Sequence, residues 1–233
     1  IMFDLKIIPI YQIPKKSICI GNLSVVGTGK TPLVIYLTNL LSKDKSITIL
    51  SRGYGRSTKG FRKVDKLDDC SEIGDESMQY LNQFGDSVQI AVSEKRVEGV
   101  QKMEIIHPET DIYILDDAYQ HRYVKAGFNI LLTDYSKPFF NDLLLPAGNL
   151  REWRKGKNRA DCILVTKCPK DLTTDEKKSF VSKMNLSHNH IFFSSLKYGE
   201  IVPVSEHQIE TPKQILLVTG IANPTPLINY LKL

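Results

Sequence analysis

A glycine-rich turn between an apolar run and a helical stretch constrains this chain more than any other feature. The apolar residues 17–23 lead into Gly27-Thr28-Gly29-Lys30-Thr31, and Pro32 follows at a position that suits the first turn of a helix. Glycines let successive N–H groups point inward, and a helix N-terminus adds partial positive charge, so the segment predicts a phosphate-binding loop. The stripe of the following helix, residues 32–42, that we expect to face the core consists of Leu33, Tyr36, Leu37 and Leu40.

Two side chains of this turn suit nucleotide chemistry. Lys30 is placed to reach the terminal phosphates, and the Thr31 hydroxyl is placed to hold Mg²⁺. The strict pattern requires glycine where Ser24 stands, so the turn is a variant, and an ordinary glycine-rich turn between a strand and a helix is the alternative. The residues that we expect to contact the nucleotide are Ser24, Val25, Val26, Gly27, Thr28, Gly29, Lys30 and Thr31.

Composition limits the remaining classes. With 233 residues, of which 42% are hydrophobic, the chain can bury a large core and suits one domain plus part of another. The formal charge of +5 is compatible with an anionic substrate or membrane surface but is too small to indicate nucleic acid. No run reaches the roughly 18 apolar residues of a membrane-spanning helix. The four cysteines lack paired spacing, which predicts reduced packing residues and no zinc site.

Eight apolar runs alternate with amphipathic stretches, which predicts an α/β fold with a mostly parallel sheet flanked by helices, as in P-loop NTPases. We expect a nucleotide-binding core over residues 1–168 and the start of a smaller second α/β domain over residues 169–233. The chain begins at Ile1 ahead of Met2 and stops within a helical pattern, so we expect a piece that is cut at both ends. The predicted strands are 17–23, 46–51, 88–93, 111–117, 128–134, 162–167, 191–197 and 214–220.

Acidic residues follow two of these elements. Asp116 and Asp117 come after a buried strand, where a P-loop protein places a second carboxylate near the loop-bound metal, so one or the other is assigned to Mg²⁺. The alternative is that one of them only caps the next turn. Asp75 precedes a helical stretch and is a candidate to orient a hydroxyl and accept its proton, although it could instead complement the helix N-terminus.

Several basic residues follow the carboxyl ends of predicted strands, which should lie at one edge of the sheet. Guanidinium groups bind phosphate oxygens in pairs, so a set of arginines there favours a polyanionic substrate besides the nucleotide. His121, next to Gln120, could donate to that substrate or act as an acid. The arginines are Arg52, Arg56, Arg96, Arg122 and Arg151.

A GTPase or metal-delivery switch protein is the alternative class. Thr166-Lys167-Cys168-Pro169 follows a strand and partly matches the guanine-reading N-K-x-D motif. Pro169 stands where the motif needs an aspartate, so no carboxylate accepts the N–H groups of guanine. Adenine is therefore the expected base, and ATP the expected nucleotide.

Five motifs occur in order along the chain: Gly21-Asn22-Leu23-Ser24 with residues 27–32, Ser51 to Arg56, Gly74-Asp75-Glu76, Asp116 to His121, and Leu145 to Glu152. Together they resemble the tetraacyldisaccharide 4'-kinase family. The resemblance implies ATP- and Mg²⁺-dependent phosphorylation of the 4'-hydroxyl of a tetraacyl glucosamine disaccharide 1-phosphate, a lipid A precursor. It further implies a peripheral protein, expected to be a monomer, on the cytoplasmic face of the inner membrane of a Gram-negative bacterium. The family also has an N-terminal membrane helix and a later histidine, and we expect both to lie beyond the ends of this sequence.

Residue roles follow from the resemblance by motif. Lys30 and Thr31 would contact the phosphates, Asp75 would act as the base with Lys30 and His121 as further catalytic groups, and the metal would be held by Thr31, Asp116, Asp117 and Glu152. The substrate side would comprise Asn22, Arg52, Glu76, Arg96, Gln120, His121 and Arg151.

Overall fold

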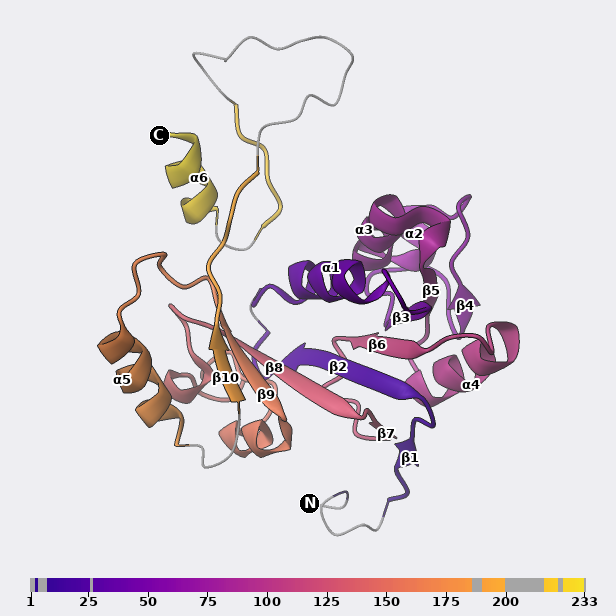
Figure 1. The fold of residues 1–233 in the computed structure, drawn as a ribbon, viewed down its shortest axis with the longest axis horizontal. Helices are drawn as coiled ribbons and strands as arrows, with labels where there is room; N and C mark the ends of the chain where they lie inside the picture. Colours follow the sequence, from indigo (N-terminus) through magenta and orange to yellow (C-terminus); the bar gives the residue numbers. More distant parts are fainter. Residues whose placement is uncertain are drawn as a thin grey trace.

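A computed structural model describes residues 3, 8–25, 27–185, 190–199, 216–221 and 224–232. Its centre is an eight-stranded sheet with the order β10-β9-β8-β2-β6-β3-β5-β4 (Figure 1). Every pairing in this sheet is parallel except the one between β4 and β5. The strands are β2 (Lys16–Asn22), β3 (Ile47–Ser51), β4 (Arg62–Lys63), β5 (Gln89–Val92), β6 (Ile112–Asp116), β8 (Phe128–Asp134), β9 (Cys162–Thr166) and β10 (His190–Phe193), with β1 (Tyr11–Gln12) and β7 (Val124–Lys125) forming a separate pair.

Helices cover both faces of the sheet (Figure 1). Side chains that alternate along a strand enter two separate cores, because successive residues point to opposite faces. Ile114 of β6 joins Val34 and Tyr80 on one face, whereas Leu115 joins Met103 on the other. The helices are α1 (Lys30–Leu41), α2 (Cys70–Ile73), α3 (Asp75–Phe84), α4 (Arg96–Ile106), α5 (Thr174–Met184) and α6 (Thr225–Leu231), with short 3-10 turns at Gly85–Ser87, Phe139–Asn141 and Arg154–Arg159.

The stripe expected on the first helix is wrong in part. Tyr36 is 63% exposed and Leu40 52% exposed, whereas Val34 and Thr38 are the buried residues of α1. Apolar side chains occur almost all round this helix, so its periodicity does not select one face. The register of α1 on the sheet is therefore a tertiary choice.

Seven of the eight predicted strands are confirmed, with end shifts of a few residues. The eighth covers residues 214–220, of which 214 and 215 lie outside the described residues, and 216–220 form no strand. α5 and β10 lie beyond the expected boundary at residue 168, yet β10 pairs with β9 and extends the main sheet. The division into two domains stays a prediction.

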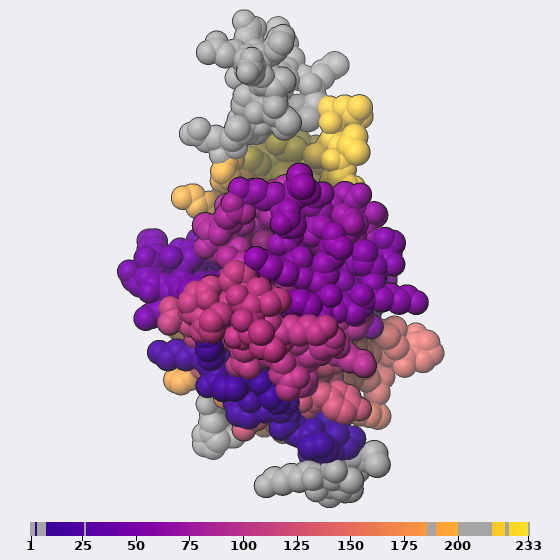
Figure 2. Space-filling model, turned by 90° about the vertical axis from the view of Figure 1, so that its right-hand side faces the viewer, coloured from indigo at the N-terminus to yellow at the C-terminus, as the bar shows by residue number. Residues whose placement is uncertain are grey.

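The C-terminal described segment lies apart from the sheet. α6 stands away from the other helices in Figure 1, and Tyr230 stacks on Tyr198 with ring centroids 4.7 Å apart. Figure 2 shows the same yellow segment above the purple and pink residues that include α3 and α4. None of the helices in the described residues is both long and apolar enough to cross a membrane.

β2 lies between β6 and β8, and the chain leaves it through α1 to reach β3 on the far side of β6. In open parallel sheets, ligands bind beyond the carboxyl ends of the strands, where the direction of winding changes. The turn after β2 stands at this place.

Candidate functional site

The glycine-rich turn joins the end of β2 to the start of α1. Gly29 precedes the helix with a φ of 87°, which L side chains rarely adopt. The fully buried Asn22 amide donates to the Thr28 hydroxyl at 2.9 Å, which ties the two ends of the turn together. A Cβ at Gly21 would lie 2.5 Å from the Cβ of Tyr119, so only glycine lets β2 pass this side chain.

A strand far away in sequence supports the turn from behind. The Thr166 hydroxyl donates to the Thr28 carbonyl at 2.8 Å, and the Lys167 amine donates to the Gly27 carbonyl at 2.5 Å. Lys167 also pairs with Asp134 at 2.8 Å. Sequence reasoning assigned Thr166 and Lys167 only to a partial guanine motif; polar residues directly after a buried strand were the signal that could have indicated this support.

The segment from Asp142 to Glu152 holds the other side of the turn. Val25 donates its backbone N–H to the Asn149 carbonyl at 2.9 Å, and Arg151 donates its own to the Leu23 carbonyl at 2.7 Å. These bonds bring the side chain of Arg151 to the carboxyl end of β6. The sequence marked Leu145 to Glu152 only as a motif, and the position of the segment beside the turn follows from backbone pairing.

Asp117 lies between two cations. Its carboxylate is 3.5 Å from the Lys30 amine and 2.9 Å from the Arg151 guanidinium. Burial acts to raise the pKa of Asp117, but the charges of Lys30 and Arg151 outweigh it and hold the pKa below its ordinary value. Asp117 is therefore an ionised group that positions both cations at the mouth of the turn.

Asp116 has the opposite environment. It is fully buried, and its Oδ2 accepts a hydrogen bond from the Tyr80 hydroxyl at 2.8 Å. Its Oδ1 has no hydrogen-bond partner among the described residues. Burial, followed by the neighbouring charge of Glu76, raises the pKa of Asp116 to about 7. Burial also raises the pKa of Glu76.

These residues fit a metal ion that takes few protein ligands. The described residues hold no group of three or more His, Cys, Asp or Glu that could bind a metal by themselves. Mg²⁺ commonly takes one or two protein oxygens and completes its shell with phosphates and water. The orphaned Asp116 Oδ1 suits this role, and the Tyr80 hydroxyl also contacts the Thr31 side chain. Glu152, the fourth expected ligand, instead pairs with Arg159 and accepts from Gln120 at 2.9 Å.

The Arg96 side chain joins the carboxyl ends of β5 and β6. Its side chain is 2% exposed and donates to the backbone carbonyls of Ser93 at 2.5 Å and Asp116 at 3.0 Å. Burial lowers the pKa of Arg96 to about 10, so the group stays charged at neutral pH. Its backbone N–H donates to Nε2 of His121 at 3.3 Å. Arg96 thus holds the backbone of Asp116 through its guanidinium and the ring of His121 through its backbone N–H.

His121 is held as a neutral ring. Burial lowers its pKa, and the charges of Arg96 and Arg52 add to the effect. Because Nε2 accepts a hydrogen bond, the proton of the neutral ring belongs on Nδ1. Arg52 itself is exposed at the same edge. Two arginines of the expected set contact residues outside the site. Arg56 pairs with Glu94 at 2.6 Å, and Arg122 covers the ring of Phe3.

Asp75 begins α3 and is exposed. Gly74 precedes it with a φ of 84°, and a Cβ there would lie 2.6 Å from the Tyr54 carbonyl oxygen. The turn after β3 therefore packs against the start of α3. Cys70 donates its thiol hydrogen to Asp75 at 2.8 Å. The next residue, Glu76, is within the electrostatic range of Lys30, which places α3's first turn beside the glycine-rich turn.

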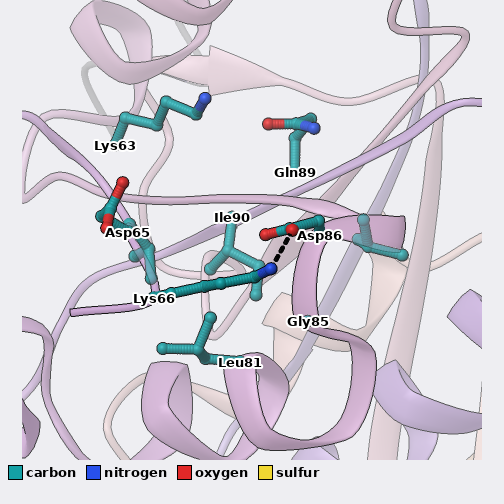
Figure 3. Close-up of a pocket in the computed structure, with 10 residues that line it drawn as sticks. Lys63, Asp65, Lys66, Leu81, Gly85, Asp86, Gln89 and Ile90 are labelled. Carbon is teal, nitrogen blue, oxygen red and sulfur yellow. Dashed lines mark ion pairs between the residues drawn. The ribbon is translucent and has the colours of Figure 1, made fainter. Parts of the chain in front are cut away.

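Two concave sites lie outside this constellation. The first, of about 170 Å³, lies at the amino end of β5, where Lys63, Asp65 and Gln89 surround the ion pair of Lys66 and Asp86 (Figure 3). The second, of about 600 Å³, follows the Asp142 to Lys155 segment and is mainly apolar. Neither is lined by the residues that the sequence assigned to phosphate or metal.

A parallel sheet with Lys30 and Thr31 at a glycine-rich turn, and a buried aspartate at the end of the adjacent strand, defines the class of P-loop nucleotide-binding proteins with a kinase-like fold. Residues 1–233 match the sequence model of the LpxK family, tetraacyldisaccharide-1-P 4'-kinase, and the chain belongs to that family.

Several relatives show the same similarity. The chain is 44% identical to the tetraacyldisaccharide 4'-kinase of Bacteroides fragilis over 93% of its length and 60% of that protein. It is 42% identical to that of Flavobacterium johnsoniae over 99% of its length and 69% of that protein. A crystal structure of LpxK from Aquifex aeolicus in complex with ATP superimposes with a TM-score of 0.68 at 34% identity, covering 83% of this chain and 57% of that one. The chain thus spans about three fifths of the length of the first relatives that it matches.

Proposed function

We propose that this protein transfers the γ-phosphoryl group of ATP to the 4'-hydroxyl of a tetraacyl glucosamine disaccharide 1-phosphate, in lipid A synthesis. The observation that carries the proposal is the family match over residues 1–233, on a chain that keeps Lys30 and Thr31 at the turn after β2. The relatives named tetraacyldisaccharide 4'-kinase and the relative crystallised with ATP support it. We further propose a monomer that lies peripherally on the cytoplasmic face of the inner membrane.

A GTP-dependent switch fits less well. In the partial guanine motif, the Lys167 amine is bound to the Gly27 carbonyl and to Asp134. Pro169 offers no carboxylate to the base. The motif therefore has a supporting role behind the turn, and ATP is the proposed nucleotide.

In the proposed mechanism, backbone N–H groups of residues 27–31 and the Lys30 amine bind the β- and γ-phosphates. Asp117 and Arg151 keep Lys30 oriented through the contacts described above. Asp75 orients the acceptor hydroxyl and takes its proton as the oxygen attacks the γ-phosphorus. The bond from the γ-phosphorus to the oxygen that bridges it to the β-phosphate breaks, and ADP leaves with that oxygen. Thr31 and Asp116 would hold Mg²⁺, which when bound neutralises charge on the phosphates. Asp117 and Glu152 would support the metal site from beside these two residues.

The acceptor is itself anionic, and the positive side of the site suits it. Arg52 is exposed beside His121, and Arg151 is partly exposed at the mouth of the turn. Asn22 and Gln120 are joined by a hydrogen bond from the Gln120 amide to the Asn22 carbonyl at 2.7 Å, which orients Gln120 toward Glu152. We assign Arg52, Gln120, His121 and Arg151 to the acceptor side, with Asn22, Glu76 and Arg96 positioning them.

The test is phosphoryl transfer by the full-length protein. γ-Labelled ATP is incubated with Mg²⁺ and the tetraacyl disaccharide 1-phosphate in detergent micelles, with GTP and lipid-free reactions as controls. Label is expected in the lipid with ATP, and Lys30→Ala should slow its transfer by roughly 10²–10³-fold. Hydrolysis of nucleotide with an unlabelled lipid, or a preference for GTP, would contradict the proposal.

A further inference from the structure

We propose that the segment 142–157, which we call the apolar-basic loop, docks on the surface of an anionic phospholipid bilayer. Its apolar side chains would enter the headgroup region, and its basic side chains would meet the lipid phosphates. The proposal rests on the proposed function only for its biological purpose, because the binding test below needs neither ATP nor an acceptor.

The loop exposes large apolar side chains that belong together. Leu143 is 56% exposed, Leu145 54% and Trp153 74%. Leu143 and Trp153 line the apolar cavity of about 600 Å³, together with Leu144 and Leu150. Exposed apolar groups gathered around a hollow mark an interaction surface, and tryptophan is enriched at the boundary between membrane and water.

The backbone holds these side chains in place instead of letting them collapse inward. Asp142 accepts hydrogen bonds from the N–H groups of Leu143 and Asn149 at 2.8 and 3.0 Å. Leu150 donates to the Leu143 carbonyl at 2.9 Å, and the Arg154 side chain donates to the Asp142 carbonyl at 2.6 and 3.0 Å. The exposed apolar surface is therefore ordered before any partner binds, which lowers the entropic cost of docking.

Charge selects an anionic bilayer as the partner. Arg154 and Lys155 line the same cavity, and both are exposed. Lys157 follows one 3-10 turn later and anchors the loop to the end of α5 by donating to the Met184 and Asn185 carbonyls. Tryptophan, leucine and basic residues on one surface are the composition that binds at the interface of anionic membranes.

The loop is continuous with the nucleotide site. Asn149 accepts from Val25 of the glycine-rich turn, and Arg151 pairs with Asp117. A bilayer bound to Leu143 and Trp153 would therefore lie beside the phosphate-binding turn. A lipid acceptor could then reach the site without leaving the membrane surface.

Trp153 is the only tryptophan in the 233 residues, so intrinsic fluorescence reports on the loop directly. The protein is mixed with phosphatidylcholine vesicles that contain phosphatidylglycerol, and with vesicles of phosphatidylcholine alone. We expect a blue shift with the anionic vesicles, quenching by brominated lipid, and reversal by 0.5 M NaCl, because salt at about that level shortens the screening length to a few ångströms.

Three results would overturn the proposal: no binding to anionic vesicles, co-sedimentation with vesicles while Trp153 stays in water, or an equal blue shift on raising the protein concentration without vesicles, which would indicate self-association. If label transfer to the lipid acceptor fails while the vesicle shift persists, the proposed function fails and this surface stands. The reverse outcome removes only the surface.

Variants locate the contact by co-sedimentation. Leu143→Ser and Lys155→Glu should each weaken binding to anionic vesicles by roughly tenfold, since each removes a favourable apolar or charged contact. The matched controls are Ile105→Ser on α4, where Ile105 is 81% exposed, and Lys43→Glu, also at an exposed residue. Circular dichroism checks folding, and equal losses in test and control variants would also overturn the proposal.

Discussion

The two ends of the sheet differ in what they bury. At the carboxyl end, Asp116 and Arg96 are almost fully inaccessible, and burial shifts both pKa values toward the neutral forms. At the amino end of β5, the hollow in Figure 3 holds the pair Lys66 and Asp86, whose side chains are 63% and 70% exposed. Both regions contain opposite charges, but only one of them removes charge from water.

The difference shows that a hollow in the surface and a set of buried charged residues occur at opposite ends of this sheet. Burying a charged group costs free energy unless its partners compensate. Asp116 is buried with one carboxylate oxygen unpaired, so its place in the fold is better explained by a function than by stability. An exposed pair such as Lys66 and Asp86 is screened by water and contributes little. The following predictions test this contrast, from the largest expected effect to the smallest.

Removing the charged groups at the carboxyl end should have the largest effect. Lys30→Ala and Asp75→Asn are each expected to lower kcat by roughly 10²–10³-fold, because the first removes the cation that we propose binds the phosphates and the second the proposed proton acceptor. Turnover of labelled ATP to the lipid measures the loss, and thermal unfolding checks the fold. Activity near that of the unmodified protein in either variant would contradict the assigned role.

Filling the space beside β2 should cost stability. Gly21→Ala places a Cβ against Tyr119, and overpacking of this kind lowers the free energy of unfolding by about 1–3 kcal/mol. Urea denaturation measures the change. The control is Gly55→Ser, which has open space around it but a positive φ of 79°, and which separates crowding from backbone strain. Equal losses in the two variants would reject the crowding argument.

Support from behind the turn should matter less than the turn itself. Lys167→Ala removes the hydrogen bond to the Gly27 carbonyl and is expected to weaken ATP binding by roughly tenfold, the equivalent of one charge-assisted hydrogen bond. Isothermal titration with ATP and Mg²⁺ measures it. An unchanged affinity would show that the turn holds its shape without β9.

His121 should titrate below its ordinary range. Burial and the positive charges of Arg96 and Arg52 disfavour the protonated ring, so its pKa lies under 6.5 and the ring is neutral at pH 7. Arg52→Ala removes one of these charges and should move the pKa upward. NMR titration of the ring protons follows both, and a downward shift in the variant would contradict this electrostatic explanation.

A substitution in the hollow at the amino end of β5 should have almost no effect on activity. Lys66→Ala breaks the exposed pair with Asp86 and is expected to change kcat by less than about twofold, in line with the small effects of surface substitutions. The same labelled-ATP assay measures it. A loss comparable to that of Lys30→Ala would remove the contrast between the two ends.

The strands and the glycine-rich turn were predictable because their signals are local, whereas the roles of the candidate residues stay predictions. Runs such as 112–115 are continuous and apolar since β6 is covered on both faces, and Gly29 reveals its turn through a conformation that other residues avoid. The buried face of α1 was not predictable, because apolar residues surround that helix and only packing distinguishes Val34 from Tyr36. Part of the apolar-basic loop, Leu145 to Glu152, was visible as a motif, but its place beside the turn was not.

The sequence by itself determined the fold class, the family motifs and the phosphate-binding turn, since these depend on residues within a few positions of one another. Tertiary structure decided that Asp116 is buried against Tyr80 while Asp117 joins Lys30 to Arg151. It also decided that Lys167, which follows β9, supports Gly27 from 140 residues away. Such contacts arise when sheet order brings distant strand ends to one edge. Burial then sets the charge of each group, and no local pattern encodes that environment.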